Sequence, residues 1–190
     1  MKKITTGMIL LCSLCLAACA GKPNNTRPQA WLKPGVKVTL PAPAMVPPVN
    51  EQQLLTGSFK GQQQSLLVLL NADEHQLSLA GLSSLGIRLF RITYDEHGIH
   101  TEQSIVLPDM PPASQVLADI MLSHWPVSAW RPQLPKGWLL EDRGDQRVLL
   151  DADGNVVTEI QYMNRNGRRE PISVRQWVFG YHIVIQSLDS

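Results

Sequence analysis

The chain of 190 residues is poor in cysteine, in net charge and in long apolar runs. Its three cysteines, Cys12, Cys15 and Cys19, all lie near the N-terminus, so no disulfide can staple the rest of the chain and packing must hold it together. Lysine and arginine number 17 against 16 aspartates and glutamates, which argues against the dense basic surface that nucleic-acid binding requires. No run after the N-terminus reaches the roughly 20 apolar residues of a transmembrane helix.

The first 18 residues have the three-part layout of a secretory signal. Lys2 and Lys3 form a basic start, residues 8–16 are apolar, and two small residues stand before Cys19. The apolar run is too short to remain in a bilayer as a spanning helix. We therefore predict removal of residues 1–18, which leaves 172 residues, enough for one domain with its own core.

The end of this segment, Leu16-Ala17-Ala18-Cys19, resembles the bacterial lipobox. The resemblance implies that Cys19 carries a lipid and becomes the new N-terminus, and the alternative is an ordinary signal peptide that happens to contain cysteines. By the same resemblance, Ala20 in place of Asp points to the outer membrane and its periplasmic face. Each buried acyl methylene contributes about 0.8 kcal/mol, so acyl chains can anchor the chain without a membrane span.

Residues 19–50 are rich in proline, with seven of the fourteen prolines of the chain. Proline fixes φ and removes a backbone donor, so this segment is predicted to be a lipidated N-terminus followed by an extended, semi-rigid tether. Only residues 36–40 within it are typical of a strand.

Residues 51–190 show closely spaced strand patterns and one helix. Residues 75–80 alternate apolar and polar, whereas residues 64–71 are almost uniformly apolar at their centre. Residues 113–125 have an apolar stripe at helical spacing, and a proline follows directly. We predict a mainly β (α+β) domain, a single curved antiparallel sheet of roughly eight to eleven strands with one inserted helix.

A set of apolar residues is expected to face the interior of this sheet. One interpretation is a cavity for an acyl chain or a polyene, with the helix as a plug or movable lid, since each buried methylene contributes about 0.8 kcal/mol. The other is an ordinary packed core without a cavity. The sequence leaves both open for these residues: Leu67, Leu69, Leu77, Leu79, Val116, Leu117, Ile120 and Met121.

Glycines bracket a short loop at residues 81–86 that carries Leu82 and Leu85 between serines. The loop fails the G-x-S-x-G pattern of a hydrolase nucleophile, and the five histidines show no H-E-x-x-H spacing. We find no catalytic constellation and expect neither enzyme activity nor a cofactor or metal. The two leucines either reach a lipid or a partner, or tuck under the sheet as ordinary packing.

Residues 77–86 resemble the strand-loop-strand of LolB-like outer-membrane lipoproteins, and residues 158–167 are similar to a late hairpin of that family. Residues 134–138 look closer still to a related lipoprotein family of unknown function, often encoded in aryl polyene pathways. The resemblance covers most of residues 50–188. It implies a half-barrel with an apolar concave face closed by a helix, and it makes Leu85, with Leu82 second, the residue that inserts into the membrane.

Two functions follow from this resemblance. The first is a protein that takes an apolar cargo (an acyl chain, a lipoprotein or a polyene lipid) from a LolA-like periplasmic carrier and passes it to the outer membrane. The second is a packed scaffold, without a ligand cavity, that holds an envelope biosynthesis or export complex together.

Overall fold

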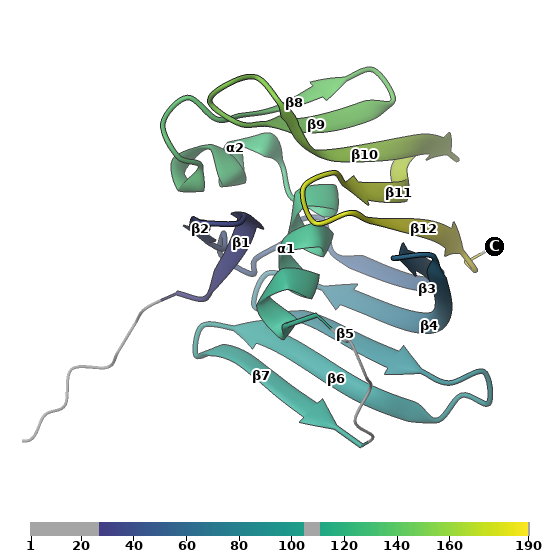
Figure 1. The fold of residues 1–190 in the computed structure, drawn as a ribbon. Coiled ribbons are helices and arrows are strands. Elements are labelled where there is room, and N and C mark those ends of the chain that lie inside the picture. Colours follow the sequence, from purple (N-terminus) through teal and green to yellow (C-terminus); the bar gives the residue numbers. More distant parts are fainter. Residues whose placement is uncertain (1–26, 105–110, 190) are drawn as a thin grey trace, which may run out of the picture.

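The computed structural model describes residues 27–104 and 111–189. Twelve strands and three short helical segments make up these ranges (Figure 1). The strands are β1 Gln29–Lys33, β2 Val36–Thr39, β3 Val49–Phe59, β4 Gln62–Ala72, β5 Leu77–Leu82, β6 Arg88–Asp95, β7 Gly98–Gln103, β8 Leu139–Arg143, β9 Gln146–Leu150, β10 Val156–Arg165, β11 Arg168–Gln176 and β12 Tyr181–Ser187. The helices are α1 Ala113–His124, α2 Val127–Trp130 and a 3₁₀ turn, η1, at Arg131–Gln133.

One antiparallel sheet of ten strands dominates the fold, in the order β7-β6-β5-β4-β3-β12-β11-β10-β9-β8. The sheet is open, with β7 and β8 at its two edges, and it curves around α1 (Figure 1). The predicted mainly β fold with an antiparallel sheet is therefore confirmed, and so is the helix predicted over residues 113–125. Helix α1 ends at Trp125, which has an extended backbone and precedes a proline that cannot continue the helix.

Tight turns join most neighbouring strands and fix their pairing. Lys60-Gly61 joins β3 to β4 and Asn166-Gly167 joins β10 to β11, and all four residues have positive φ. Two successive residues of positive φ are typical of a two-residue hairpin, whose twist matches that of the strands. The hairpin expected to turn at the end of residues 158–167 is confirmed.

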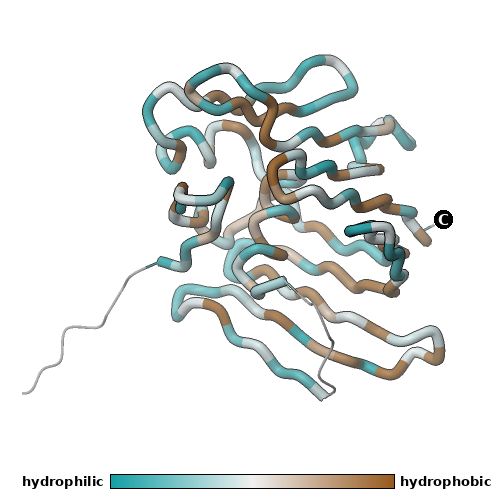
Figure 2. The backbone as a smooth tube through the Cα atoms, in the orientation of Figure 1, coloured by the Kyte–Doolittle hydropathy of each residue, from teal (hydrophilic) through white to brown (hydrophobic). Residues whose placement is uncertain are grey.

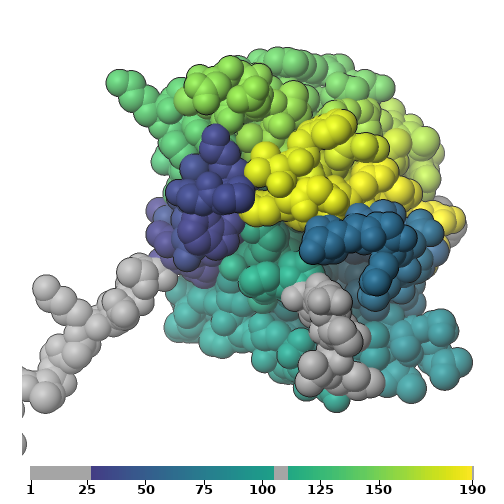
Figure 3. All heavy atoms as spheres, viewed as in Figure 1, coloured from purple at the N-terminus to yellow at the C-terminus, as the bar shows by residue number. Residues whose placement is uncertain are grey.

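The predicted tether over residues 19–50 is wrong from residue 29 onward, but the strand predicted within it at residues 36–40 is confirmed as β2. Strands β1 and β2 form a separate hairpin, and the chain after it also enters the core. Figure 3 shows this N-terminal part, in purple, packed against the rest of the molecule. The prolines lie mostly outside the two strands, so the alternating apolar residues between them could pair and be buried. The buried residues are Ala30, Leu32, Val38, Leu40 and Met45.

The pairing register corrects part of the predicted interior. Residues that pair across an antiparallel ladder share one face of the sheet, and neighbours along a strand point to opposite faces. Leu77 and Leu79 face the core together with their partners on β4. Leu67 and Leu69 on β4 point to the outer face instead. Their assignment to the same interior as Leu77 and Leu79 is therefore wrong.

Side chains of the sheet hold the C-terminal end of α1. The last carbonyls of a helix lack partners within it. Arg147 on β9 donates from Nη1 to the carbonyl oxygens of Leu122 and Trp125, at 2.8 and 2.7 Å. The Tyr162 hydroxyl on β10 donates to the Ser123 carbonyl at 2.8 Å. These contacts fix one end of α1 inside the curved sheet.

Candidate functional site

The turn between β5 and β6 presents apolar side chains to solvent. Leu85 is 84% exposed and Ile87 is 58% exposed. The Ser83 hydroxyl accepts hydrogen bonds from the backbone N–H groups of Leu85 and Ile87, at 3.3 and 3.2 Å. The backbone of Ser83 also bonds to Ile87 and Gly86, and Gly86 has a φ of 76°. This closed turn holds Leu85 outward.

Of the two readings of this loop, packing under the sheet is wrong for Leu85. Leu82 is half-buried and lies on the outer face, where it pairs with Leu67. Leu67 in turn pairs with Leu54 on β3, so three leucines form one row across the outer face. Figure 2 shows the apolar residues of β4 and β5 in brown. The exposed tip therefore continues into an apolar strip on the sheet.

The remaining predicted interior residues lie in or beside the main core. Leu77, Leu79, Leu117 and Met121 are at most 2% exposed and belong to one apolar cluster. The other two helix residues, Val116 and Ile120, are partly buried and pack against this cluster. In this structure the interior is closely packed around α1, and a movable helix stays a prediction.

A polar cluster lies between α1 and the C-terminal strands, and the sequence analysis missed it. Asp119 accepts hydrogen bonds from the Tyr181 hydroxyl and from Gln176 Nε2, the second at 3.2 Å. Gln115 lies one helical turn before Asp119, and Thr158 pairs with Gln176 across the sheet. The only available signal was Gln115 and Asp119 at i and i+4, next to the apolar stripe of the helix.

Burial dominates the electrostatics of this cluster. Desolvation raises the pKa of Asp119 from 3.8 to about 6, although the hydrogen bonds from Tyr181 and Gln176 oppose the shift. Burial also raises the pKa of the Tyr181 hydroxyl, and the neighbouring Asp119 carboxylate raises it further. Asp119 is therefore a carboxyl group whose charge changes in the mildly acidic range.

Two surface hollows lie away from the predicted interior residues. One, of about 300 Å³, is mostly apolar and lies where the proline-rich segment meets the end of α1; Met45, Trp125 and Ala129 are among its lining residues. The other, of about 1000 Å³, is an open groove between Arg27 and the turns that follow β4 and β6. Neither hollow is lined by the leucines predicted to bind cargo.

Several sequence predictions lie outside what the structure describes. Cys19 and the predicted signal peptide, residues 1–18, precede the first described residue. Within residues 27–104 and 111–189, no helix is long and apolar enough to cross a membrane. The same ranges contain no group of three His, Cys, Asp or Glu side chains placed to hold a metal ion.

Comparison with known protein families gives a match over most of the chain. A family described as a protein of unknown function (DUF3261) matches residues 50–189. No curated protein matches the chain. The family match begins at the second residue of β3, so the β1–β2 hairpin lies outside it.

Proposed function

The chain belongs to the DUF3261 family, and we propose that it is a lipoprotein anchored through Cys19 at the periplasmic face of the outer membrane. It binds an apolar cargo (an acyl chain, a lipoprotein or a polyene lipid) that a LolA-like carrier delivers, and it helps place that cargo in the membrane. The observation that carries the proposal is the exposed Leu85, held outward by a closed turn and continuous with an apolar strip on the sheet.

The free energy gained by burying the apolar side chains of the β5–β6 turn in a bilayer is enough to help cargo insert, but too small to anchor the protein. Full burial of a leucine or isoleucine side chain contributes about 1.5–3 kcal/mol. Leu85 and Ile87 together supply a few kcal/mol, less than a lipid anchor with two or three acyl chains. The tip can therefore perturb the bilayer surface and withdraw again, as a transfer step requires.

The interior supplies the second element of the proposal. An open antiparallel sheet that curves around α1 is compatible with the LolB-like half-barrel that the sequence resembles. Cargo enters beside α1, where its chain takes over apolar contacts that Leu117 and Met121 make, while the polar side of α1 stays on the sheet. The acyl chain then replaces the helix contacts, methylene for methylene, at about 0.8 kcal/mol each.

The test uses the lipid-anchored protein in liposomes and a pyrene-labelled, dipalmitoylated peptide as cargo. We expect Leu85→Glu to take up the peptide normally and to slow its transfer to the bilayer roughly tenfold or more, since a charge now meets the hydrocarbon. Met163→Glu, at an exposed position on β10, is the matched control and should transfer at the wild-type rate. Equal rates for both variants, or no uptake by the wild type, would overturn the proposal.

One observation favours a second function, that of a scaffold. Leu77, Leu79, Leu117 and Met121 are almost completely buried, as in a packed core. Native mass spectrometry of residues 20–190, purified without detergent, separates the two functions. A retained acyl or polyene mass supports the carrier. A bare protein mass that persists after addition of fatty acid supports a scaffold that works through protein contacts.

A further inference from the structure

Three polar atoms in the buried cluster beside α1 have no hydrogen-bond partner of good geometry among the described residues: Gln115 Nε2 on α1, Thr158 Oγ1 on β10 and Gln176 Oε1 on β11. The Gln115 side chain also faces the Tyr181 hydroxyl and lowers its pKa by hydrogen bonding, so the two atoms on the sheet, Thr158 Oγ1 and Gln176 Oε1, are the ones that lack any partner there. Thr158 and Gln176 are each 1% exposed, and Gln115 is 9% exposed. Thr158, Gln176 and Tyr181 form one row across the sheet, so these groups face α1 from the same side.

Such atoms are rare in folded proteins because each one loses its bonds to water and gains nothing in return. Their chemistry defines what is missing. The Gln115 amide nitrogen is a donor, the Gln176 oxygen is an acceptor, and the Thr158 hydroxyl can do either. The Gln176 amide is oriented by its own bond to Asp119, at 3.2 Å. A complementary group must both accept and donate hydrogen bonds.

We propose that this cluster binds the neutral head group of a single-chain amphiphile, a hydroxyl group by preference, while the alkyl chain occupies the apolar interior beside α1. The inference rests on the proposed function, because the chain site is the one assigned there to the cargo. It adds the chemical class of the cargo: an apolar chain that ends in a group able to donate and accept hydrogen bonds.

The surroundings of the cluster fit both ends of such a ligand. Leu117 and Met121, which line the apolar interior, lie on α1 close to Asp119 and Gln115. On the other side Tyr181 stacks with Phe179, with ring centres 6.5 Å apart, and pairs with the half-exposed Phe59.

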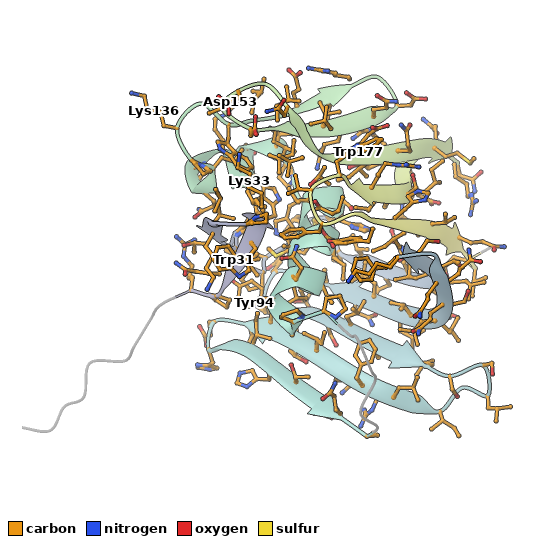
Figure 4. The ribbon with its side chains drawn as sticks, viewed as in Figure 1. Trp31, Lys33, Tyr94, Lys136, Asp153 and Trp177 are labelled. Carbon is orange, nitrogen blue, oxygen red and sulfur yellow. The ribbon has the colours of Figure 1, made fainter. Side chains whose placement is uncertain are left out.

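Phe59 and Phe179 therefore form an aromatic edge beside Tyr181, which gives a chain a surface on which to enter. Trp177, labelled in Figure 4, is not part of this edge, because its ring packs against Arg175 on the outer face of the sheet.

The charge in the cluster selects against anionic heads. Asp119 is its one acidic group, and the hydrogen bonds described for this carboxylate come from the neutral groups of Tyr181 and Gln176. A carboxylate or phosphate head would add a second negative charge in a site of low dielectric. A hydroxyl group carries no such penalty, and it supplies both functions that the unpartnered atoms require.

The test compares two probes of equal chain length, decan-1-ol and decyl methyl ether, by competition with a fluorescent apolar dye bound to residues 20–190. Only the alcohol can donate a hydrogen bond. The partition of each probe between water and an alkane gives the affinity ratio expected from apolar burial alone. We expect the wild type to favour the alcohol over the ether by roughly two- to tenfold beyond that ratio, which corresponds to the net free energy of one or two neutral hydrogen bonds.

Thr158→Val removes an unpartnered hydroxyl at constant shape and should abolish most of that preference. Gln115→Met is the second variant, should Thr158→Val fold poorly. Thr93→Val, on β6, is the matched control and should keep the preference. Equal discrimination in Thr158→Val and wild type, or none in the wild type, overturns the inference and leaves water as the occupant. Failure of both probes to bind instead overturns the proposed function with it.

Discussion

Asp119 on α1 accepts a hydrogen bond from the hydroxyl group of Tyr181 on β12, and this contact places a carboxyl group that is only 7% exposed inside the fold. It joins the inserted helix to the C-terminal half of the sheet. Gln176 supplies a second bond to the same carboxyl group. The side of α1 that faces β11 and β12 is therefore polar, whereas Leu117 and Met121 on the same helix belong to the apolar core.

The raised pKa of Asp119 predicts that the fold loses stability as pH rises. The pKa is about 6 in the folded chain and 3.8 in the unfolded chain, so the folded state binds more protons between these values. The stabilisation is fully present below about pH 4 and is lost as pH rises through 6. The difference corresponds to about 3 kcal/mol.

Urea unfolding of wild type and Asp119→Asn between pH 4 and 7.5 measures this effect. The variant cannot ionise, so its free energy of unfolding should rise relative to wild type as the pH increases. The comparison cancels the other carboxyl groups, such as Asp142 and Asp151, whose lowered pKa values act in the opposite direction. A pH-independent difference between the two proteins would contradict the buried position of Asp119.

Substitution of Arg147 should cause a large loss of stability, because its side chain holds the end of α1. Its side chain is 5% exposed, and it bonds to two carbonyls at the end of α1 and to both oxygens of Asp142. Arg147→Met leaves the two helix carbonyls unpaired inside the fold, whereas the exposed Asp142 keeps its bond from Arg169, so the free energy of unfolding should fall by roughly 1–3 kcal/mol for each carbonyl. Arg143→Met, at an exposed ion pair with Glu141, should cost less than about 1 kcal/mol. Comparable losses for the two variants in urea unfolding would refute this account.

The sequence predicted those parts of the fold in which local pattern and tertiary structure agree. Residues 75–80 alternate, and β5 buries Leu77 and Leu79 as the alternation requires. Residues 64–71 do not alternate, so nothing local decides which leucines of β4 face the core. The pairing with β5 decides it, and it turns Leu67 outward. Strand existence was therefore predictable, and strand orientation was not.

The site was predictable to a similar extent. Leu85 stands beside a glycine in a serine-rich turn, and its exposure follows from that local chemistry. The polar cluster depends on contacts between residues distant in sequence, such as Asp119 and Tyr181, and no spacing rule announces it. The N-terminal hairpin was not predicted for a related reason. Proline content constrains the local backbone of a segment, but it does not show whether the segment packs against a distant part of the chain.

That hairpin predicts that residues 50–190, the span of the family match and one residue more, cannot fold stably alone. The truncation removes five buried apolar side chains, including Leu32 and Leu40, and full burial of a leucine contributes about 1.5–3 kcal/mol. It also removes Lys33 (labelled in Figure 4), whose Nζ lies 2.9 Å from Asp151 Oδ2. The summed loss approaches the whole stability of a typical domain, about 5–15 kcal/mol.

Circular dichroism with thermal melting compares this truncation with residues 27–190. The longer protein should show a cooperative transition, and the shorter one should show none or one at much lower temperature. If the two proteins melt alike, the buried hairpin contributes nothing to the fold.

The position of Arg27, where the described fold begins, sets how far the domain could stand from the lipid proposed on Cys19. Seven residues lie between Cys19 and Arg27, and the eight Cα–Cα steps that join them span at most about 28 Å. Arg27 lies beside the turn that follows β6, whereas Leu85 lies beyond the other end of β6, a strand of eight residues and about 26 Å. Leu85 can therefore reach the anchoring bilayer only if the spacer is nearly at full length or β6 lies inclined to the membrane.

Shortening the spacer should consequently stall transfer while leaving uptake of the labelled peptide intact. Deletion of residues 21–26 leaves a reach of about 7 Å, which holds the Arg27 end of β6 against the membrane and restricts the angles at which the Leu85 end can meet it. Replacing the same six residues by glycine and serine keeps the length and should keep the wild-type transfer rate. A deleted protein that transfers as fast as the replaced one would mean that Leu85 acts on something other than the anchoring membrane. Its exposed side chain would then point to a protein partner.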